Sequence, residues 1–153
     1  MLIVDKAVEK NKSLMKDAVD KGARVVYGDV NHNETSATRM RPIIISGVKP
    51  EMNIYKQESF GPTVSVIPFK DEEEALRIAN DTEYGLSSAI FSTDLRKALR
   101  LAKKIETGAV HINRMSVQDE AALPHGGAKA SGWGRFNGAI DEWVRTKNIT
   151  FDV

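Results

Sequence analysis

A glycine-rich stretch near the end of the chain holds three side chains suited to acid–base chemistry. Asp119, Glu120 and His125 lie within seven residues of one another, and a histidine beside carboxylates can exchange protons near neutral pH. Four glycines follow, at positions 126, 127, 132 and 134. Glycine lets a ligand or a neighbouring strand approach the backbone closely. We therefore predict that His125, Asp119 and Glu120 are acid–base groups; alternatively, His125 fills space beside the glycine turn and both carboxylates are solvated.

The composition excludes several other chemistries. The chain contains no cysteine, so it has no disulfide, no thiolate metal ligand and no cysteine nucleophile. Its three histidines, His32, His111 and His125, lack the spacing of metal ligands. We therefore expect no metal site.

Charge and hydropathy argue against nucleic-acid and membrane partners. Lys and Arg number 22 and Asp and Glu number 21, so the chain lacks the electrostatic field that attracts phosphate backbones or anionic lipids. No apolar run approaches the length of about 20 residues that spans a bilayer, and the start of the chain lacks the features of a signal peptide. We expect a cytoplasmic protein with no nucleic-acid and no membrane partner.

Hydrophobic periodicity predicts the elements that position these side chains. Apolar residues at steps of three and four predict a helix over 4–19 that ends at Gly22. Asp71 caps a second helix, with Glu74 completing a capping box, and Gly108 ends a third helix that opens at 92–94. A short helix is predicted at 139–144. Strands are predicted at 24–27, 42–46, 63–69 (mostly buried), 87–91, 109–113 and 145–151. Residues 50–62 read as irregular and 84–86 as a turn.

The order of these elements predicts an α/β fold. Alternating strands and helices from 63 to 113 form the βαβ pattern, which implies a mainly parallel sheet flanked by helices in a single domain over 1–153. Ligands bind at the carboxyl ends of the strands in such a sheet. Segment 114–137 follows a strand, has little periodicity and is longer than most structureless loops, whereas 50–62 leads into a strand. The residues alone therefore favour 114–137 as the site.

Five ordered motifs together resemble a known family. They are residues 57–62 (QESFGP), residues 123–136 (LPHGGAKASGWGRF), and the shorter runs 21–23, 84–86 and 108–113. The first two resemble the EXFGP and PFGGxKxSGxGR motifs in the C-terminal part of the aldehyde dehydrogenase superfamily. Within it, the variants at 124–127 and 132–136 look most similar to the branch that oxidises aromatic aldehydes such as salicylaldehyde and vanillin. The resemblance implies a partial aldehyde dehydrogenase catalytic domain.

The resemblance also implies roles for individual residues. Glu58 matches the carboxylate that binds the ribose hydroxyls of NAD, and Phe60 matches the aromatic residue beside the nicotinamide; both are physically suited to these roles. Alternatively, Glu58 caps a turn and Phe60 belongs to the core. His125 stands where the family usually has phenylalanine lining the substrate tunnel, and 114–123 matches the loop that shapes this tunnel. A small-molecule carbonyl compound is the implied ligand.

The missing cysteine decides what the inherited site can do. In the family a cysteine thiolate attacks the aldehyde and a glutamate activates the hydrolytic water, and these groups and the NAD domain match segments before this chain. We therefore expect the isolated chain to use no cofactor, NAD being that of the ancestral reaction. Part of the sheet that buries this half of the parent fold is missing as well, which leaves apolar faces exposed. We therefore expect a homo-oligomer or pairing with another chain.

Three hypotheses of function remain. The first is a stand-alone truncated protein repurposed for non-redox acid–base chemistry, as an isomerase, cyclase, lyase or aldol-type enzyme with His125, Asp119 and Glu120; its start at Met1, at the head of a helix, favours it. The second is one half of a split, NAD-dependent aromatic aldehyde dehydrogenase that needs a partner chain. The third is a non-catalytic pseudoenzyme that binds intact relatives. Ligand screening with NAD and with carbonyl compounds distinguishes them.

Overall fold

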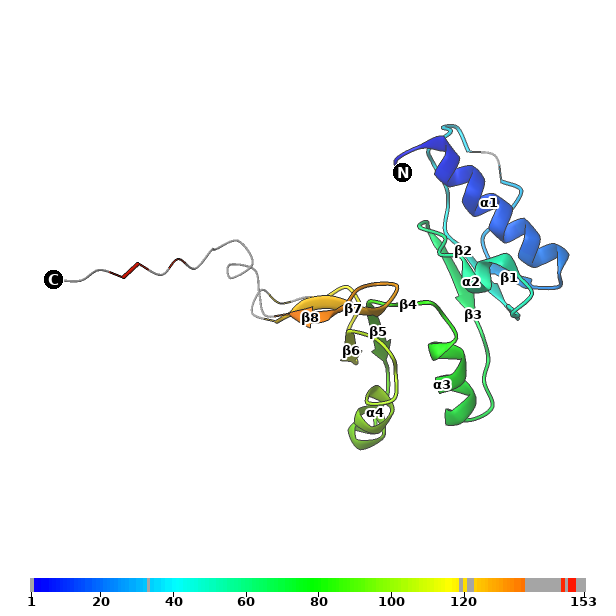
Figure 1. Cartoon of the computed structure of the whole chain (residues 1–153). Coiled ribbons are helices and arrows are strands. Elements are labelled where there is room, and N and C mark those ends of the chain that lie inside the picture. Colours follow the sequence, from blue (N-terminus) through cyan, green and yellow to red (C-terminus); the bar gives the residue numbers. More distant parts are fainter. Residues whose placement is uncertain are drawn as a thin grey trace. The chain divides into compact units, whose positions relative to one another are not determined.

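Helices and strands alternate along the chain in an α/β structure, as the sequence predicts (Figure 1). The computed structural model describes residues 2–32, 34–118, 120, 123–136, 147, 149 and 150. The chain divides into two compact units, Met1–Lys70 and Asp71–Val153. That the whole chain forms one domain stays a prediction.

The first unit is a three-stranded sheet with a long helix. Its elements are α1 (Asp5–Asp20), β1 (Arg24–Tyr27), β2 (Ile43–Ser46), α2 (Asn53–Lys56) and β3 (Thr63–Val66). The strand order is β1-β2-β3, with β1 antiparallel and β3 parallel to β2. The predicted first helix and the first two strands are confirmed. Gly22, with φ of 99°, follows the C-cap of α1 as predicted.

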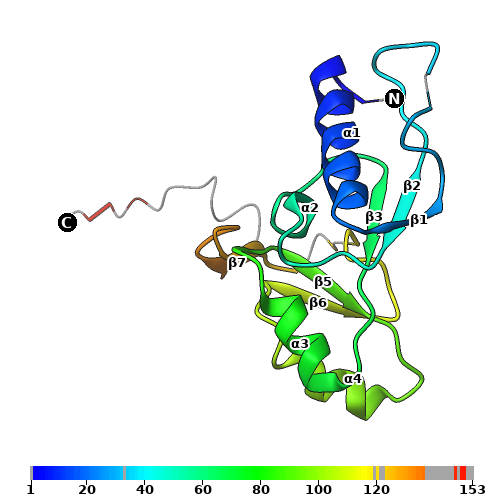
Figure 2. The same cartoon turned by 90° about the vertical axis from the view of Figure 1, so that its right-hand side faces the viewer.

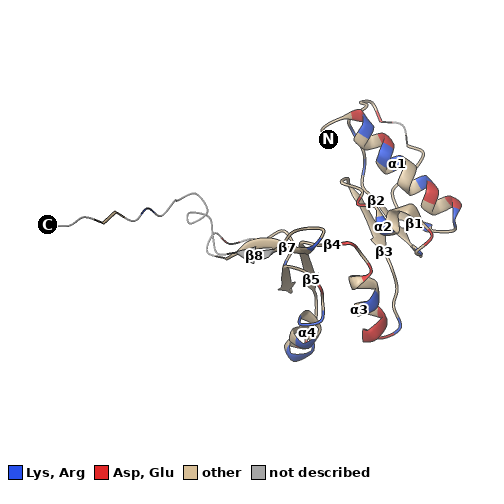
Figure 3. Cartoon of the chain, in the orientation of Figure 1, with Lys and Arg blue, Asp and Glu red and all other residues tan. Residues whose placement is uncertain are grey.

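The core of the first unit lies between α1 and the sheet (Figure 2). Met15 and Ala18 of α1 are fully buried together with Ile45 of β2 and Met52 of the loop before α2. These apolar residues of α1 recur at helical spacing, so a single stripe of the helix faces the strands. Burial of this stripe explains why α1 forms despite its many charged residues, which are of mixed sign along the helix (Figure 3).

Two predictions for the first unit are wrong in detail. Segment 50–62, expected to be irregular, contains the short helix α2. β3 ends at Val66 rather than at residue 69, and Val64 and Val66 are 54% and 44% exposed rather than buried. The register explains the exposure: Thr63 and Ser65 pair with the buried Ile43 and Ile45, so they share the face that α1 covers, and the valines point the other way.

The second unit contains a βαβ unit and a separate antiparallel sheet. Its elements are α3 (Glu72–Asn80), β4 (Tyr84–Gly85), β5 (Ser87–Ile90), α4 (Leu95–Ala102), β6 (Ala109–Ile112), β7 (His125–Lys129) and β8 (Gly134–Phe136). β5 and β6 are parallel and are joined through α4, as the sequence predicts. β7 pairs antiparallel with both β4 and β8.

The helix caps of the second unit agree with the sequence. Asp71 accepts a hydrogen bond from the Glu74 backbone N–H at 2.9 Å, and Asp94 accepts one from the Lys97 N–H at 2.9 Å. The first turn of α3 is acidic, which suits the positive end of the helix dipole (Figure 3). α4 ends at Ala102, earlier than the predicted stop at Gly108.

The antiparallel strands were not predicted. Residues 84–86 were expected to be a turn and 114–137 a loop without elements, but β4 pairs with β7, and β7 with β8, in those segments. The predicted helix at 139–144 lies outside the described residues. So does the predicted strand at 145–151, apart from Lys147, Ile149 and Thr150, which belong to no element. Within the part of the chain that the structure describes, no helix is long and apolar enough to cross a membrane.

Candidate functional site

Segment 58–62 in the first unit is held against α1 by its backbone. The Asn11 side-chain amide donates to the Ser59 carbonyl at 2.9 Å, and Lys10 Nζ donates to the Glu58 carbonyl at 2.9 Å. Thr63 Oγ1 lies 2.7 Å from Ser59 Oγ and 3.3 Å from Asn11 Oδ1, within hydrogen-bond distance of both. The Pro62 carbonyl accepts from the Ile43 N–H at 3.0 Å, which joins the segment to β2.

This anchored backbone presents two side chains outwards. Phe60 has φ of 53°, a left-handed conformation that non-glycine residues rarely adopt, and its side chain is 77% exposed. The alternative that Phe60 belongs to the core is therefore wrong for this chain. Glu58 is exposed, and its carboxylate has no hydrogen bond or ion pair with the described residues. Among the described residues, therefore, no hydrogen bond of the Glu58 carboxylate supports the alternative that Glu58 caps a turn.

The glycine-rich segment of the second unit forms a hairpin. His125 opposes Phe136 at its open end, and Gly127 opposes Gly134 near its turn. Close packing explains two of the glycines: a Cβ on Gly108 would lie 2.2 Å from the Gly126 carbonyl oxygen, and one on Gly127 would lie 2.6 Å from Ser131 Cβ. Gly108, just before β6, thus lets the hairpin lie close to that strand, whereas Gly127 lets the turn fold back onto β7.

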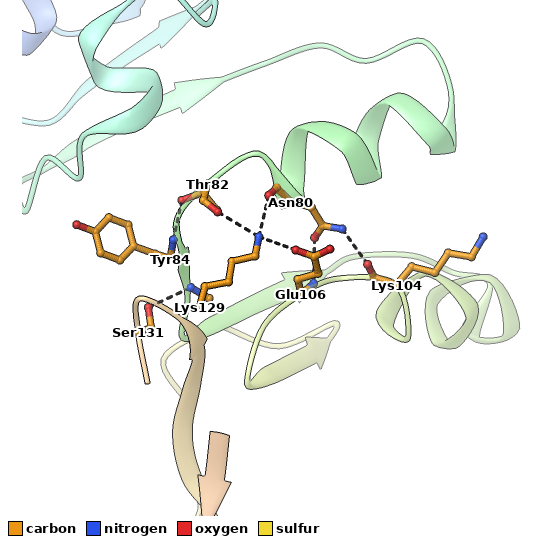
Figure 4. A network of polar contacts seen from close by, with 8 residues as sticks. Asn80, Thr82, Tyr84, Lys104, Glu106, Lys129 and Ser131 are labelled. Carbon is orange, nitrogen blue, oxygen red and sulfur yellow. Dashed lines mark hydrogen bonds and ion pairs between the residues drawn. The ribbon is translucent and has the colours of Figure 1, made fainter. Parts of the chain in front are cut away.

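A lysine network fixes the other end of β7 (Figure 4). The Lys129 ammonium donates to the carbonyls of Asn80 at 2.8 Å and Thr82 at 3.1 Å, and it lies 2.7 Å from Glu106 Oε2. Asn80 Oδ1 accepts from the Glu106 N–H at 2.9 Å, and Asn80 Nδ2 donates to the Lys104 carbonyl at 2.9 Å. All three ammonium protons thus have acceptors, and β7 is tied both to the end of α3 and to the α4–β6 connection.

The three acid–base candidates are placed only in part. His125 is the exposed first residue of β7. Glu120 forms an exposed ion pair with Arg114, with 3.8 Å between Arg114 Nη2 and Glu120 Oε1. Asp119 lies outside the described residues. A joint acid–base role for the three stays a prediction.

The clearly perturbed carboxylates lie away from these segments. A hydrogen bond from Lys21, aided by the Asn53 N–H, lowers the pKa of Asp17 in α1. Hydrogen bonds from Lys97 and Arg100 of α4 lower the pKa of Glu72 in α3. Both carboxylates link neighbouring helices, so their perturbation indicates a structural role. Among the described residues no group of three or more His, Cys, Asp or Glu side chains could hold a metal ion.

Sequence reasoning missed the residues that hold these segments in place. Asn11 lies within the predicted first helix but was not singled out, and Lys129 was one letter of a motif. A fully buried asparagine is uncommon, and Asn11 sits beside the apolar stripe of α1, which was the available signal. No local pattern could link Lys129 to Asn80 or Glu106, because these contacts span more than twenty residues.

Comparisons with known proteins agree with the motifs. The sequence model described as "Aldehyde dehydrogenase family" matches residues 1–149. The chain is 47% identical over 146 residues to the salicylaldehyde dehydrogenase of Pseudomonas putida, covering 94% of this chain and 29% of the relative. It is 44% identical over 151 residues to the vanillin dehydrogenase of Pseudomonas sp. (strain HR199 / DSM 7063), covering 97% and 31%. The chain thus spans less than a third of these relatives.

Solved structures show the same fold. The salicylaldehyde dehydrogenase of Pseudomonas putida G7, complexed with salicylaldehyde, matches with a TM-score of 0.82 at 47% identity, covering 92% of this chain and 28% of that one. The Mycobacterium tuberculosis aldehyde dehydrogenase complexed with NAD+ matches with a TM-score of 0.81 at 34% identity, covering 90% and 28%. These likenesses extend over most of the present chain.

Proposed function

Because the chain belongs to the aldehyde dehydrogenase family, we propose that it supplies one part of an NAD-dependent site that oxidises an aromatic aldehyde. Glu58 and Phe60 serve the cofactor side of this site. His125 and segment 114–123, which the resemblance matches to the substrate tunnel, serve the aldehyde. The names of the salicylaldehyde and vanillin dehydrogenases support an aromatic aldehyde as the substrate class.

The presentation of Glu58 and Phe60 is the observation that carries the proposal. Backbone contacts fix segment 58–62, while the Glu58 carboxylate is exposed and unpaired within the described residues and the Phe60 ring is 77% exposed. A carboxylate can accept from two ribose hydroxyls at once, and an exposed ring can support a flat heterocycle. These residues therefore fit the ribose and nicotinamide of NAD. When bound, NAD supplies the hydride acceptor.

The reaction needs groups that this chain does not contain. It has no cysteine, and a serine hydroxyl without a dedicated base is a far weaker nucleophile than a thiolate near neutral pH. The thiolate must therefore come from another stretch of polypeptide, as must the remainder of the NAD site. In this proposal the present chain holds the ribose and orients the nicotinamide and the aldehyde, and it performs no bond-breaking step itself.

The other two hypotheses stay predictions. A non-redox acid–base enzyme would use His125 with Glu120 and Asp119 on a carbonyl compound and would need no NAD. A non-catalytic partner of intact relatives would bind no small molecule. No contact among the described residues favours either hypothesis over aldehyde oxidation. The names of the relatives favour aldehyde oxidation.

A chimaera tests the proposal directly. The part of the Pseudomonas putida salicylaldehyde dehydrogenase that aligns with this chain is replaced by the chain, and NADH formation from salicylaldehyde is measured. We expect NAD-dependent oxidation, and we expect Glu58→Gln to raise the KM for NAD about tenfold, since a neutral amide accepts more weakly and with one oxygen fewer. Glu51→Gln, an equal change at an exposed glutamate of the same unit, is the matched control.

Two outcomes would contradict the proposal. The first is a folded chimaera that binds NAD but oxidises no aldehyde. The second is equal KM values for NAD in the Glu58→Gln and Glu51→Gln chimaeras. Turnover of a carbonyl compound by the chain alone without NAD, abolished by His125→Ala, would instead establish the non-redox hypothesis.

A further inference from the structure

We propose that Asn11 of α1 is a positioning residue for the cofactor side of the site. It would act through segment 58–62 and contact no ligand itself. The inference rests on the proposed role of Glu58 and Phe60, and it adds a residue outside the motif that determines whether these side chains are presented.

Asn11 is fully buried, yet all of its polar atoms are used. Its Nδ2 donates to the Ala7 carbonyl at 2.8 Å, one turn earlier in α1, and to the Ser59 carbonyl at 2.9 Å. Its Oδ1 lies 3.3 Å from the hydroxyl of Thr63, which follows the segment. One side chain thus joins the helix to Ser59 and Thr63, on either side of residues 60–62, and a buried amide with both N–H groups bonded is held in one orientation.

The shape of the segment complements Asn11. A Cβ on Gly61 would lie 2.3 Å from Asn11 Oδ1, 2.5 Å from its Cγ and 2.6 Å from its Nδ2. Gly61 therefore leaves the space that the amide occupies, and the two residues fit only as a pair. Because Gly61 is packed against a fully buried side chain, the preceding residue cannot relax freely. This explains why Phe60 keeps a left-handed φ of 53° and an exposed ring.

Only an amide provides this combination of groups at position 11. Aspartate has the same shape, but as a carboxylate it has no N–H and would face the Ala7 and Ser59 carbonyl oxygens with a negative charge. Leucine would leave the Ser59 carbonyl without this donor. Either change should loosen segment 58–62, although the hydrogen bond from Lys10 of α1 to the Glu58 carbonyl is kept, while the apolar core formed by Met15 and Ile45 is unaltered.

The full chain, labelled with fluorinated phenylalanine, tests the positioning. The Phe60 resonance is assigned from its loss in Phe60→Leu. The folded segment holds Phe60 in a left-handed conformation, so we expect Asn11→Asp to shift this resonance towards its position in the urea-unfolded chain. Asn31→Asp, the same change at an exposed asparagine of the first unit, should leave it in place. Thr63→Val keeps the shape of the side chain but removes the hydroxyl, so it should shift the resonance less than Asn11→Asp. It replaces Asn11→Asp in the test if that variant does not fold.

The chimaera then tests the consequence for NAD. Asn11→Asp should raise the KM for NAD about tenfold, because small misplacement of a binding group is costly, while kcat stays within about twofold of the parent. A general loss of structure would instead lower kcat as well. An unchanged Phe60 resonance and an unchanged KM in Asn11→Asp and Thr63→Val would overturn the inference. If Glu58→Gln has no effect on KM, the proposed function fails, whereas the resonance still decides the role of Asn11.

Discussion

In each of the two segments that resemble the family motifs, one residue makes several of the anchoring contacts, but the two residues act by opposite physical means. Segment 58–62 is held by Asn11, a neutral amide that is 0% exposed. β7 is held by Lys129, a charged ammonium whose side chain is 24% exposed and lies 2.7 Å from the Glu106 carboxylate. The first fastening depends on shape and on hydrogen bonds in a dry environment, and the second depends on charge near water.

This difference determines what each segment responds to. A buried amide carries no charge, so salt and pH leave its hydrogen bonds unaltered, but any change of volume beside it is costly. A partly exposed ion pair tolerates changes of volume but is screened by salt. We therefore expect small steric changes to destabilise segment 58–62 and changes of charge to destabilise β7.

The largest effect should come from steric change in the first unit. Gly61→Ala places a Cβ 2.3 Å from Asn11 Oδ1, and we expect it to lower the free energy of unfolding by about 3 kcal/mol, the upper range for overpacking. Urea unfolding measures this loss. In an Asn11→Ala background the clash is removed, so the same glycine change should cost much less.

Gly47→Ala is the matched control for Gly61→Ala. Gly47 has φ of 76° but nothing within 4 Å of the added Cβ, so it reports backbone strain alone, at about 1–2 kcal/mol. If Gly61→Ala costs equally in the parent and the Asn11→Ala background, the complementary fit of the two residues is wrong.

The next effect should come from charge in the second unit. Lys129→Met keeps the length of the side chain but removes three donors to Asn80, Thr82 and Glu106. We expect the free energy of unfolding to fall by about 2 kcal/mol, as for hydrogen bonds made by a charged group. The loss should shrink in high salt, which already weakens the parent ion pair. Lys103→Met, at an exposed lysine in the same unit, should be nearly neutral, and equal losses in both variants would contradict the role of Lys129.

A smaller effect, an increase in the free energy of unfolding, is expected from substitution of Phe60. Phe60→Asn keeps the left-handed φ of 53° at a residue that tolerates it, and little apolar area is lost because the ring is 77% exposed. We expect the free energy of unfolding to rise by about 0.5–1 kcal/mol, while NAD binding by the chimaera weakens. Phe69→Asn, at another exposed phenylalanine, should not stabilise the chain. Destabilisation by Phe60→Asn would show that the ring contributes more to folding than its exposure indicates.

The smallest effect should be the pH dependence of an exposed carboxylate. Lys97 and Arg100 lower the pKa of Glu72 in the folded chain below its ordinary value of 4.5. The folded state therefore binds fewer protons, so this stabilisation is fully present above pH 4.5 and is lost as the pH falls through the folded pKa. Glu72→Gln should reduce the acid-dependent loss of stability slightly in urea unfolding. Glu73→Gln, one residue along α3, is its control, and identical pH profiles for both variants would contradict the link between α3 and α4.

Local signals predicted most of the elements and the parallel pair β5–β6, but not β4, β7 and β8, which pair antiparallel. The stripe containing Met15, the cap at Asp71 and the β5–α4–β6 unit could be predicted because each depends on neighbouring residues or on a regular period. β7 and β8 could not, because glycine and polar residues give no alternating pattern and the strands exist only through their partners. Val64 shows the same limit: it belongs to a predicted strand, but which face the helix covers depends on the register with β2.

The sequence by itself determined the family, the α/β class and the absence of a thiol, since motifs and composition are properties of the chain alone. It also identified Glu58, Phe60 and His125 as candidates. Only the tertiary structure decided that Asn11 and Lys129 hold the segments that carry Phe60 and His125, and that Phe60 points into solvent. The physical reason is that a hydrogen bond between residues 48 positions apart leaves no trace in local periodicity.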